Sequence, residues 1–201
     1  MILKSCLFIA TALCAEASMA SLSLHKVPPE ITLEAKKGGK VQGGSWSSKE
    51  LRGKVHVVFY VAPSAERENQ KARDELKKEN FPSEKFASVA IINMKASNIP
   101  NFLISSRLSS SQKENPRTLY VEDRQRELVE KWHLADNTSD VMVFNKAGQV
   151  IFSVDGKLND DQIKEMMTLI KTELAEKPTQ QLESSKTETN SKTHRNEDQT
   201  P

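Results

Sequence analysis

The chain has 201 residues, with 29 lysines and arginines against 27 aspartates and glutamates, which leaves a formal net charge of +2. Basic and acidic residues are interspersed and no basic stripe with aromatic residues occurs, so nucleic-acid binding is the least favoured class of function. The length suits one domain of ordinary size once both ends of the chain are set aside.

Residues 1–20 have the pattern of a secretory signal peptide. Lys4 precedes a short apolar run, and the segment ends in small residues, which predicts cleavage after Ala20, with Ala17 as the second choice. The run is shorter than the roughly 20 residues that cross a bilayer, so no stable membrane insertion is expected. The sequence therefore predicts an exported protein.

Both cysteines, Cys6 and Cys14, lie within this predicted signal peptide. The exported chain would have no thiol, which excludes disulfides, thiolate catalysis and cysteine metal sites. Lipidation at Cys14 is less favoured, because Leu13 is larger than the small residue that normally precedes a lipidated cysteine. No metal or cofactor is expected, because ligand spacing is missing among His25, His56, His133 and His194.

The segment 21–48 is polar and glycine-rich, and Ile31 to Glu34 is its one candidate edge strand. Trp46 is interpreted as a packing residue that closes the core, and the residues up to Leu51 as a cap followed by a helical turn. The apolar, β-branched run from Val55 to Ala62 lacks strict alternation. It predicts a central strand that is covered on both faces.

Pro63 ends this strand, and the residues after it indicate the start of a helix. Ser64 is a good N-cap residue, Glu66 and Glu68 fall in the first turn, and the polar segment that follows contains neither glycine nor proline. The sequence therefore predicts a helix that starts at Ser64 or Ala65.

Further strands and helices are predicted in alternation after this helix. The strands are Phe86 to Ile92 and Arg117 to Asp123, and a helix lies between them within Asn98 to Ser111. A short helix is predicted at Leu128 to Leu134. The segment Val141 to Val154 has the pattern of two strands around a short glycine-bearing loop, which predicts a β-hairpin.

The last predicted element is an amphipathic helix that packs on the sheet. Asn159 to Gln162 has the pattern of a capping box. Apolar residues then recur at helical spacing, namely Ile163, Met166, Met167, Ile170 and Leu174. At this spacing the two methionines are interpreted as core residues rather than metal ligands. Residues 178–201 are almost entirely polar and predict a disordered tail.

This order of elements is that of a thioredoxin-like domain over residues 21–177, an α/β fold with a central mixed sheet flanked by helices and a C-terminal hairpin and helix. Leu51 to Val55 resembles the lead into the first core strand of such proteins, which Cys-x-x-Cys normally follows. Ser64 and Arg67 occupy the two cysteine positions here. A serine hydroxyl cannot form a mixed disulfide, so thiol–disulfide exchange is excluded.

Several segments together resemble the YtfJ family of bacterial periplasmic proteins. They are Trp46 to Val55, Ala62 to Asn69, Ile91 to Asn93, and Ser139 to Gly148 with Met166 to Ile170. The resemblance covers residues 27–177, implies a thioredoxin-like fold and a periplasmic location, and brings no catalytic residues. The proline that precedes the third core strand in that fold would fall near Ser139 or Asp140, and neither is proline.

The favoured hypothesis is a non-catalytic module that binds an extracytoplasmic protein or peptide. Two loops that the fold should bring together would form its surface. The candidate interaction residues are Pro63, Ser64, Ala65, Glu66, Arg67, Ser139 and Asp140.

Two alternatives use Ser64 differently. In a non-thiol hydrolase, Ser64 would be the nucleophile and His56 or His133 the base. His56 lies early in the strand that ends beside Ser64, so it should lie near the opposite end of the sheet. In a small-anion site, free backbone N–H groups of a helix start at Ser64 would bind the anion, although Glu66 and Glu68 already supply negative charge there.

Overall fold

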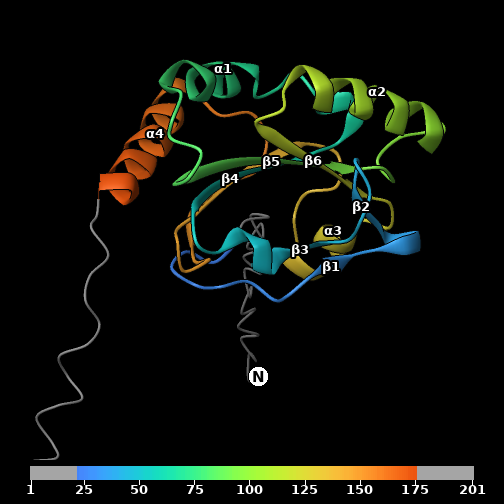
Figure 1. Ribbon diagram of the computed structural model, residues 1–201, viewed down its shortest axis with the longest axis horizontal. Coiled ribbons are helices and arrows are strands. Elements are labelled where there is room, and N and C mark those ends of the chain that lie inside the picture. The colour runs from blue at the N-terminus through green and yellow to red at the C-terminus, as the bar shows by residue number, and fades with distance from the viewer. Residues whose placement is uncertain (1–21, 176–201) are drawn as a thin grey trace, which may run out of the picture.

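A six-stranded mixed sheet runs through the computed structural model, which describes residues 22–175 (Figure 1). Its strand order is β2-β6-β5-β4-β7-β8. The parallel strands are β4 (Val55–Val61), β5 (Phe86–Asn93) and β6 (Thr118–Asp123). The antiparallel strands are β2 (Gly38–Lys40), β7 (Ser139–Phe144) and β8 (Val150–Val154). The predicted signal peptide and polar tail lie outside the described residues.

β4 is central in the sheet, and all of its residues are buried. It pairs in parallel with β5 and antiparallel with β7. Its side chains alternate between two apolar clusters, with Val57 and Phe59 on one face and Val58 and Tyr60 on the other. Burial on both faces explains why this strand is a continuous apolar run and confirms the predicted central strand.

Three helices cover one face of the sheet, α1 (Gln70–Glu79), α2 (Asn101–Glu114) and α4 (Asp160–Ala175) (Figure 1). The predicted capping box starts α4. The Asn159 side chain accepts from the Gln162 N–H and the Gln162 side chain accepts from the Asn159 N–H, both at 2.9 Å. Met166 and Met167 are buried in the core, as predicted. No helix within residues 22–175 is both long and apolar enough to cross a membrane.

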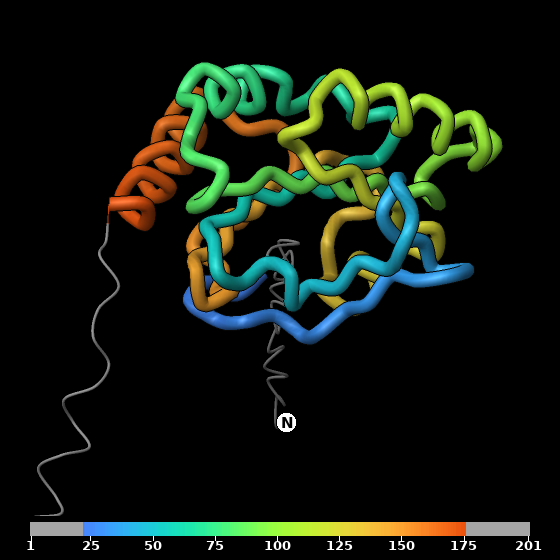
Figure 2. The backbone as a smooth tube through the Cα atoms, viewed as in Figure 1, coloured from blue at the N-terminus to red at the C-terminus, as the bar shows by residue number. Residues whose placement is uncertain are grey.

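The N-terminal segment and α3 (Glu127–Trp132) cover the other face, as the tube in Figure 2 shows. β1 (Thr32–Leu33) and β3 (Trp46–Ser47) form a separate two-stranded sheet there, and short 3₁₀ turns occupy Ala35–Lys37 and Ser48–Leu51. The Trp46 side chain is fully buried, which confirms its predicted packing role. Ser47 and Glu50 form a capping box at the second turn.

The chain after β4 differs from the predicted helix that begins at Ser64 or Ala65. Pro63–Ala65 forms a single 3₁₀ turn, and the α-helix begins only at Gln70. Consecutive turns join the two, since the Ala65 N–H donates to the Ala62 carbonyl and the Glu68 N–H to the Ala65 carbonyl. Ser64 therefore does not cap an α-helix. The local signals are those of a helix that starts at Ser64. The α-helix instead begins after Asn69, whose side chain forms hydrogen bonds with the distant Ser139 and Gly156.

Candidate functional site

The loop after β4 lies directly against the start of β7. The Ala62 N–H donates to the Thr138 carbonyl at 2.9 Å. The Asn69 side chain donates to the carbonyl and the hydroxyl of Ser139, at 2.8 and 3.1 Å. The fold therefore brings together the two loops that carry the candidate interaction residues.

The candidate interaction residues differ sharply in exposure. Ser64, Glu66 and Arg67 are exposed, and Pro63 is half-buried. The other three are buried, with exposed fractions of 3% for Ala65, 0% for Ser139 and 2% for Asp140. Only the first group offers side chains to a partner, while the buried three hold the loop in place.

Asn69 is the residue of this loop that the sequence did not single out. It is 2% exposed. Its amide nitrogen also donates to the Gly156 carbonyl at 3.0 Å, and its amide oxygen accepts from the Leu158 N–H at 2.9 Å. One side chain thus ties the start of α1 to β7 and to the loop before α4. In the sequence it stands in a polar segment with the signals of a helix interior, so nothing local marked it.

A pair of carboxyl groups lies beside this junction. The Thr138 hydroxyl is 2.8 Å from a carboxyl oxygen of Asp140 and 2.8 Å from one of Asp155. One hydroxyl hydrogen cannot serve both carboxylates, so the arrangement is satisfied when Asp140 holds a proton. Burial raises the pKa of Asp140 to about 8, and the neighbouring Asp155 adds to the shift.

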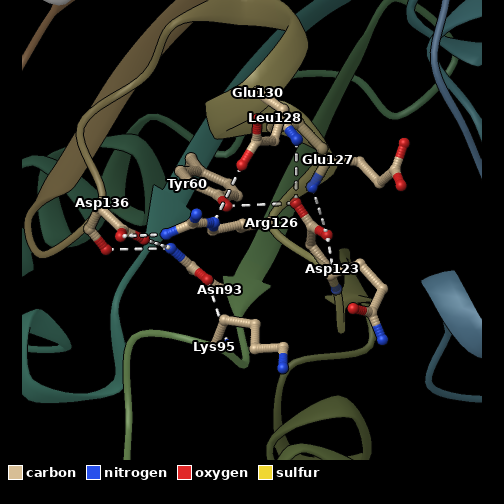
Figure 3. A network of polar contacts seen from close by, with 10 residues as sticks. Tyr60, Asn93, Lys95, Asp123, Arg126, Glu127, Leu128, Glu130 and Asp136 are labelled. Atoms are coloured by element: carbon tan, nitrogen blue, oxygen red, sulfur yellow. Dashed lines mark hydrogen bonds and ion pairs between the residues drawn. The ribbon is translucent and has the colours of Figure 1, made fainter.

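A polar network occupies the end of the parallel strands on the face that α3 covers (Figure 3). The Tyr60 hydroxyl donates to Asp123 at 3.1 Å, and burial raises the pKa of both groups. The Asn93 side chain donates to the Asp136 carboxylate at 2.7 Å, and Arg126 forms an ion pair with the same carboxylate at 3.2 Å. Through Tyr60, Asn93 and Asp123, the network joins the parallel strands β4, β5 and β6 to the segment around α3.

The carboxylates of this network already have partners within the fold: Asp136 is held by the side chains of Asn93 and Arg126, and Asp123 holds the backbone. Asp123 accepts from the N–H groups of Gln125, Glu127 and Leu128 at 2.9 to 3.3 Å, which orients the start of α3. The residues 22–175 contain no group of three or more side chains that could hold a metal ion. We therefore assign the network a structural role.

The residues of the hydrolase alternative are not assembled. His56 is the second residue of β4, whereas Ser64 follows the end of that strand. His56 is buried, its Nδ1 is 3.0 Å from the Lys54 carbonyl oxygen, and burial lowers its pKa. His133 is exposed after α3, on the opposite side of the sheet from α1. The anion alternative required the free backbone N–H groups of an α-helix that starts at Ser64, and no α-helix starts there.

A groove with a volume of about 1130 Å³ lies between α1, α2 and the sheet. Its floor comes from β4, β5 and β6 and includes the buried side chains of Phe59, Ala90 and Ile92. Pro63 and Glu66 line it as well, so the groove adjoins the loop after β4. Sequence analysis did not predict it, because helical periodicity says that two helices face the sheet but not how far apart they lie.

Apolar side chains at the start of α2 are left uncovered beside this groove. Ile99 and Leu103 line it and are 43% and 50% exposed, and Phe102 next to them is 70% exposed. Exposed apolar residues gathered at a concave surface are typical of binding sites. The groove and this rim together form the candidate binding site.

Arginines supply three of the five positive charges around the groove. Five basic and three acidic residues line it. The Arg73 guanidinium lies 5.8 Å from the centre of the Phe59 ring and donates to the Glu66 carbonyl. Arg117 donates to the Asn80 side chain and the Phe81 carbonyl. Their hydrogen-bond acceptors are uncharged, so the groove is an apolar site with a positive potential.

Solved structures with similar folds include proteins named for thiol–disulfide chemistry. A putative protein disulfide isomerase from Bacteroides thetaiotaomicron matches 79% of this chain and 95% of its own, with a TM-score of 0.59 and 15% identity. A putative thiol:disulfide interchange protein DsbE from Chlorobium tepidum matches 76% of this chain and 99% of its own, with a TM-score of 0.55 and 13% identity. At such identities the likeness shows the thioredoxin-like fold alone.

Two relatives are closer in sequence. An uncharacterized protein of Haemophilus influenzae is 30% identical over 128 residues, which cover 62% of this chain and 70% of the relative. The uncharacterized protein YtfJ of Escherichia coli K12 is 28% identical over 130 residues, which cover 63% of this chain and 70% of the relative. The family described as "Bacterial protein of unknown function (YtfJ_HI0045)" matches residues 15–173, so this chain belongs to that family.

Proposed function

We propose that this protein is a non-catalytic, periplasmic binding protein that holds an extended segment of another extracytoplasmic protein. The segment lies in the groove between α1 and α2 and contacts the exposed part of the loop after β4. The signal-peptide pattern of residues 1–20 supports export.

The observation that carries this proposal is the uncovered apolar groove. Its volume of about 1130 Å³ exceeds that of most small-molecule sites, which span roughly 300–1000 Å³. Ile99 and Leu103 remain exposed at its rim, at a cost in free energy that a bound apolar side chain would remove. A peptide of several residues fits this volume better than a metabolite.

A purely binding role agrees with the chemistry of the loop. Ser64 and Arg67 replace the two cysteines of the redox motif, and neither supports disulfide exchange. Neither candidate base faces Ser64, since His56 lies early in β4 and His133 follows α3 on the opposite side of the sheet from α1. The geometry of the thioredoxin-like fold is retained while its reactive groups are absent.

The test is photocrosslinking in cells from an unnatural amino acid at Leu103, with Ser64 as a second position. Glu165 on α4, which is exposed on a helix away from the groove, is the matched control. We expect Leu103 and Ser64 to give the same discrete adduct and Glu165 to give none. Equal labelling from all three positions, or no adduct from Leu103, would overturn the proposal.

A further inference from the structure

We infer that the segment bound in the groove is acidic as well as apolar, with carboxylates that pair with Arg73, Arg107 and Arg117. This inference rests on the proposed function, because it names the chemistry of the segment that the groove would hold.

All three arginines line the groove, and none forms an ion pair with a carboxylate among residues 22–175. Elsewhere in the described chain, charged side chains commonly pair, as Lys71 does with Asp160 at 2.6 Å and Lys171 with Glu79 at 2.6 Å. The groove thus keeps a positive charge that the three acidic residues lining it, Glu66, Asp74 and Glu114, offset only in part. A guanidinium presents its donors in a planar fork that matches a carboxylate.

Arg73 is the most constrained of the three. It is half-buried, and its guanidinium is held by the Phe59 ring, the Glu66 carbonyl and the Gln70 side chain. Burial lowers its pKa, so part of its hydration is already lost. A carboxylate arriving here meets a charge that is oriented and partly desolvated, where an ion pair is stronger than at an open surface.

Arg107 provides the cleanest probe. It is exposed on α2, and no hydrogen bond or ion pair holds its side chain within the described chain. Its replacement therefore removes a charge from the groove without removing an internal contact. Lys113 is exposed on the same helix, does not line the groove, and is likewise free of described partners, which makes it a matched control.

The apolar floor decides between an acidic peptide and a simple anion. Phe59, Ala90 and Ile92 offer no donor to an inorganic anion, and they favour apolar side chains. The chain's own residues 178–201 include several glutamates but only Leu182 as a large apolar residue. They could therefore pair with the arginines of the groove, but they lack the apolar side chains that would cover its floor. An exogenous segment with alternating apolar and acidic residues satisfies both.

The test begins with selection from a random peptide library displayed on phage, using the purified exported chain. We expect the selected peptides to be enriched in Asp and Glu beside Leu, Ile, Val and Phe. One selected peptide is then compared with two matched versions, in which Gln or Lys replaces each acidic residue. By fluorescence anisotropy, the acidic version should bind about tenfold tighter than the Gln version, and the Lys version weakest.

Arg107→Glu should weaken binding of the acidic peptide by about tenfold and improve binding of the Lys version, while Lys113→Glu should change neither by more than about twofold. If all three peptides bind equally and still block crosslinking from Leu103, the groove binds peptides but the acidic preference is wrong. If no selected peptide blocks that crosslinking, the proposed function itself fails. The proposed function also fails if Leu103 crosslinks only to residues 176–201 or only to a second copy of this chain. It fails as well if the groove binds the fatty acid dodecanoate and no peptide.

Discussion

Asp140 shows how one buried side chain can acquire a property that its sequence context does not suggest. In the sequence it follows Ser139 at the start of a strand and was a candidate surface residue. In the fold it is 2% exposed, pairs with Tyr60 in the register of β7 on β4, and shares Thr138 with Asp155. These surroundings favour the protonated form of Asp140, whose O–H group can donate a hydrogen bond within the junction.

Replacement of Asp140 by Asn tests this interpretation. Folded Asp140 keeps its proton up to about pH 8, whereas the unfolded chain releases it near 3.8, so the free energy of unfolding decreases as pH rises between these values. Asn mimics the neutral acid, so Asp140→Asn should remove this contribution and raise the free energy of unfolding at pH 8 above that of wild type, while at pH 4.5 the two proteins should differ much less. Urea denaturation of both proteins at pH 4.5 and pH 8 measures the difference.

The comparison controls for His56, whose lowered pKa makes stability fall below about pH 6.5 in both proteins alike. Asp161→Asn is the matched control, since its side chain is 92% exposed and it should leave the pH dependence unchanged. A parallel pH dependence in wild type and Asp140→Asn would show that Asp140 is ionised in the folded state.

Among the elements, those from β4 onward and the cap of α4 follow from the sequence, whereas β2, β3 and the start of α1 do not. An apolar, β-branched run predicted β4, two strand patterns around a glycine-bearing loop predicted the hairpin, and the Asn159 to Gln162 pattern predicted the cap of α4. These signals are local, because they depend on neighbouring residues alone. The start of α1 depends on Asn69, whose partners at Ser139 and Gly156 are distant in the chain.

Asn69→Ala should therefore destabilise the junction of α1, β7 and the loop before α4. The change leaves the buried Ser139 carbonyl, the buried Leu158 N–H and the half-buried Gly156 carbonyl without the Asn69 side chain, which should cost about 2–4 kcal/mol of unfolding free energy. Hydrogen exchange should show the loss at the Leu158 N–H first. Ser64→Ala is the control and should change stability by less than about 0.5 kcal/mol, because Ser64 is exposed and does not cap α1. A cost at Ser64 that equals the cost at Asn69 would restore Ser64 as the helix cap.

The two faces of the central sheet are packed differently. The face under the N-terminal segment is closed by Trp46, Trp132 and the polar network, whereas the face under α1 and α2 keeps a large groove. The closed face stabilises the fold, and the open face leaves surface for a partner. The two faces of the sheet therefore differ in packing, and the face with the groove is the one that the proposed partner would contact.

Binding at the open face should raise the stability of the whole molecule. A peptide that binds only the folded protein adds about 2.7 kcal/mol to the free energy of unfolding at a concentration 100 times its Kd. We expect a selected acidic peptide at this concentration to raise the Tm of wild type and of Lys113→Glu equally. Arg107→Glu should gain about half of that stabilisation, about 1.4 kcal/mol, because tenfold weaker binding leaves the peptide at about 10 times its Kd. Differential scanning fluorimetry measures all three. An equal rise in Arg107→Glu would mean that the peptide binds outside the groove.

The sequence by itself determined the order of strands and helices from β4 onward, the central position of β4, the cap of α4 and the absence of cysteine from the segment after β4. Each of these depends on local periodicity or on the residue at one position. Only the tertiary structure decided the presence of β2, the late start of α1, the raised pKa of Asp140 and the groove lined by Arg73, Arg107 and Arg117. These features arise where segments distant in the chain meet or fail to meet, because burial and hydrogen bonding depend on packing rather than on neighbouring residues.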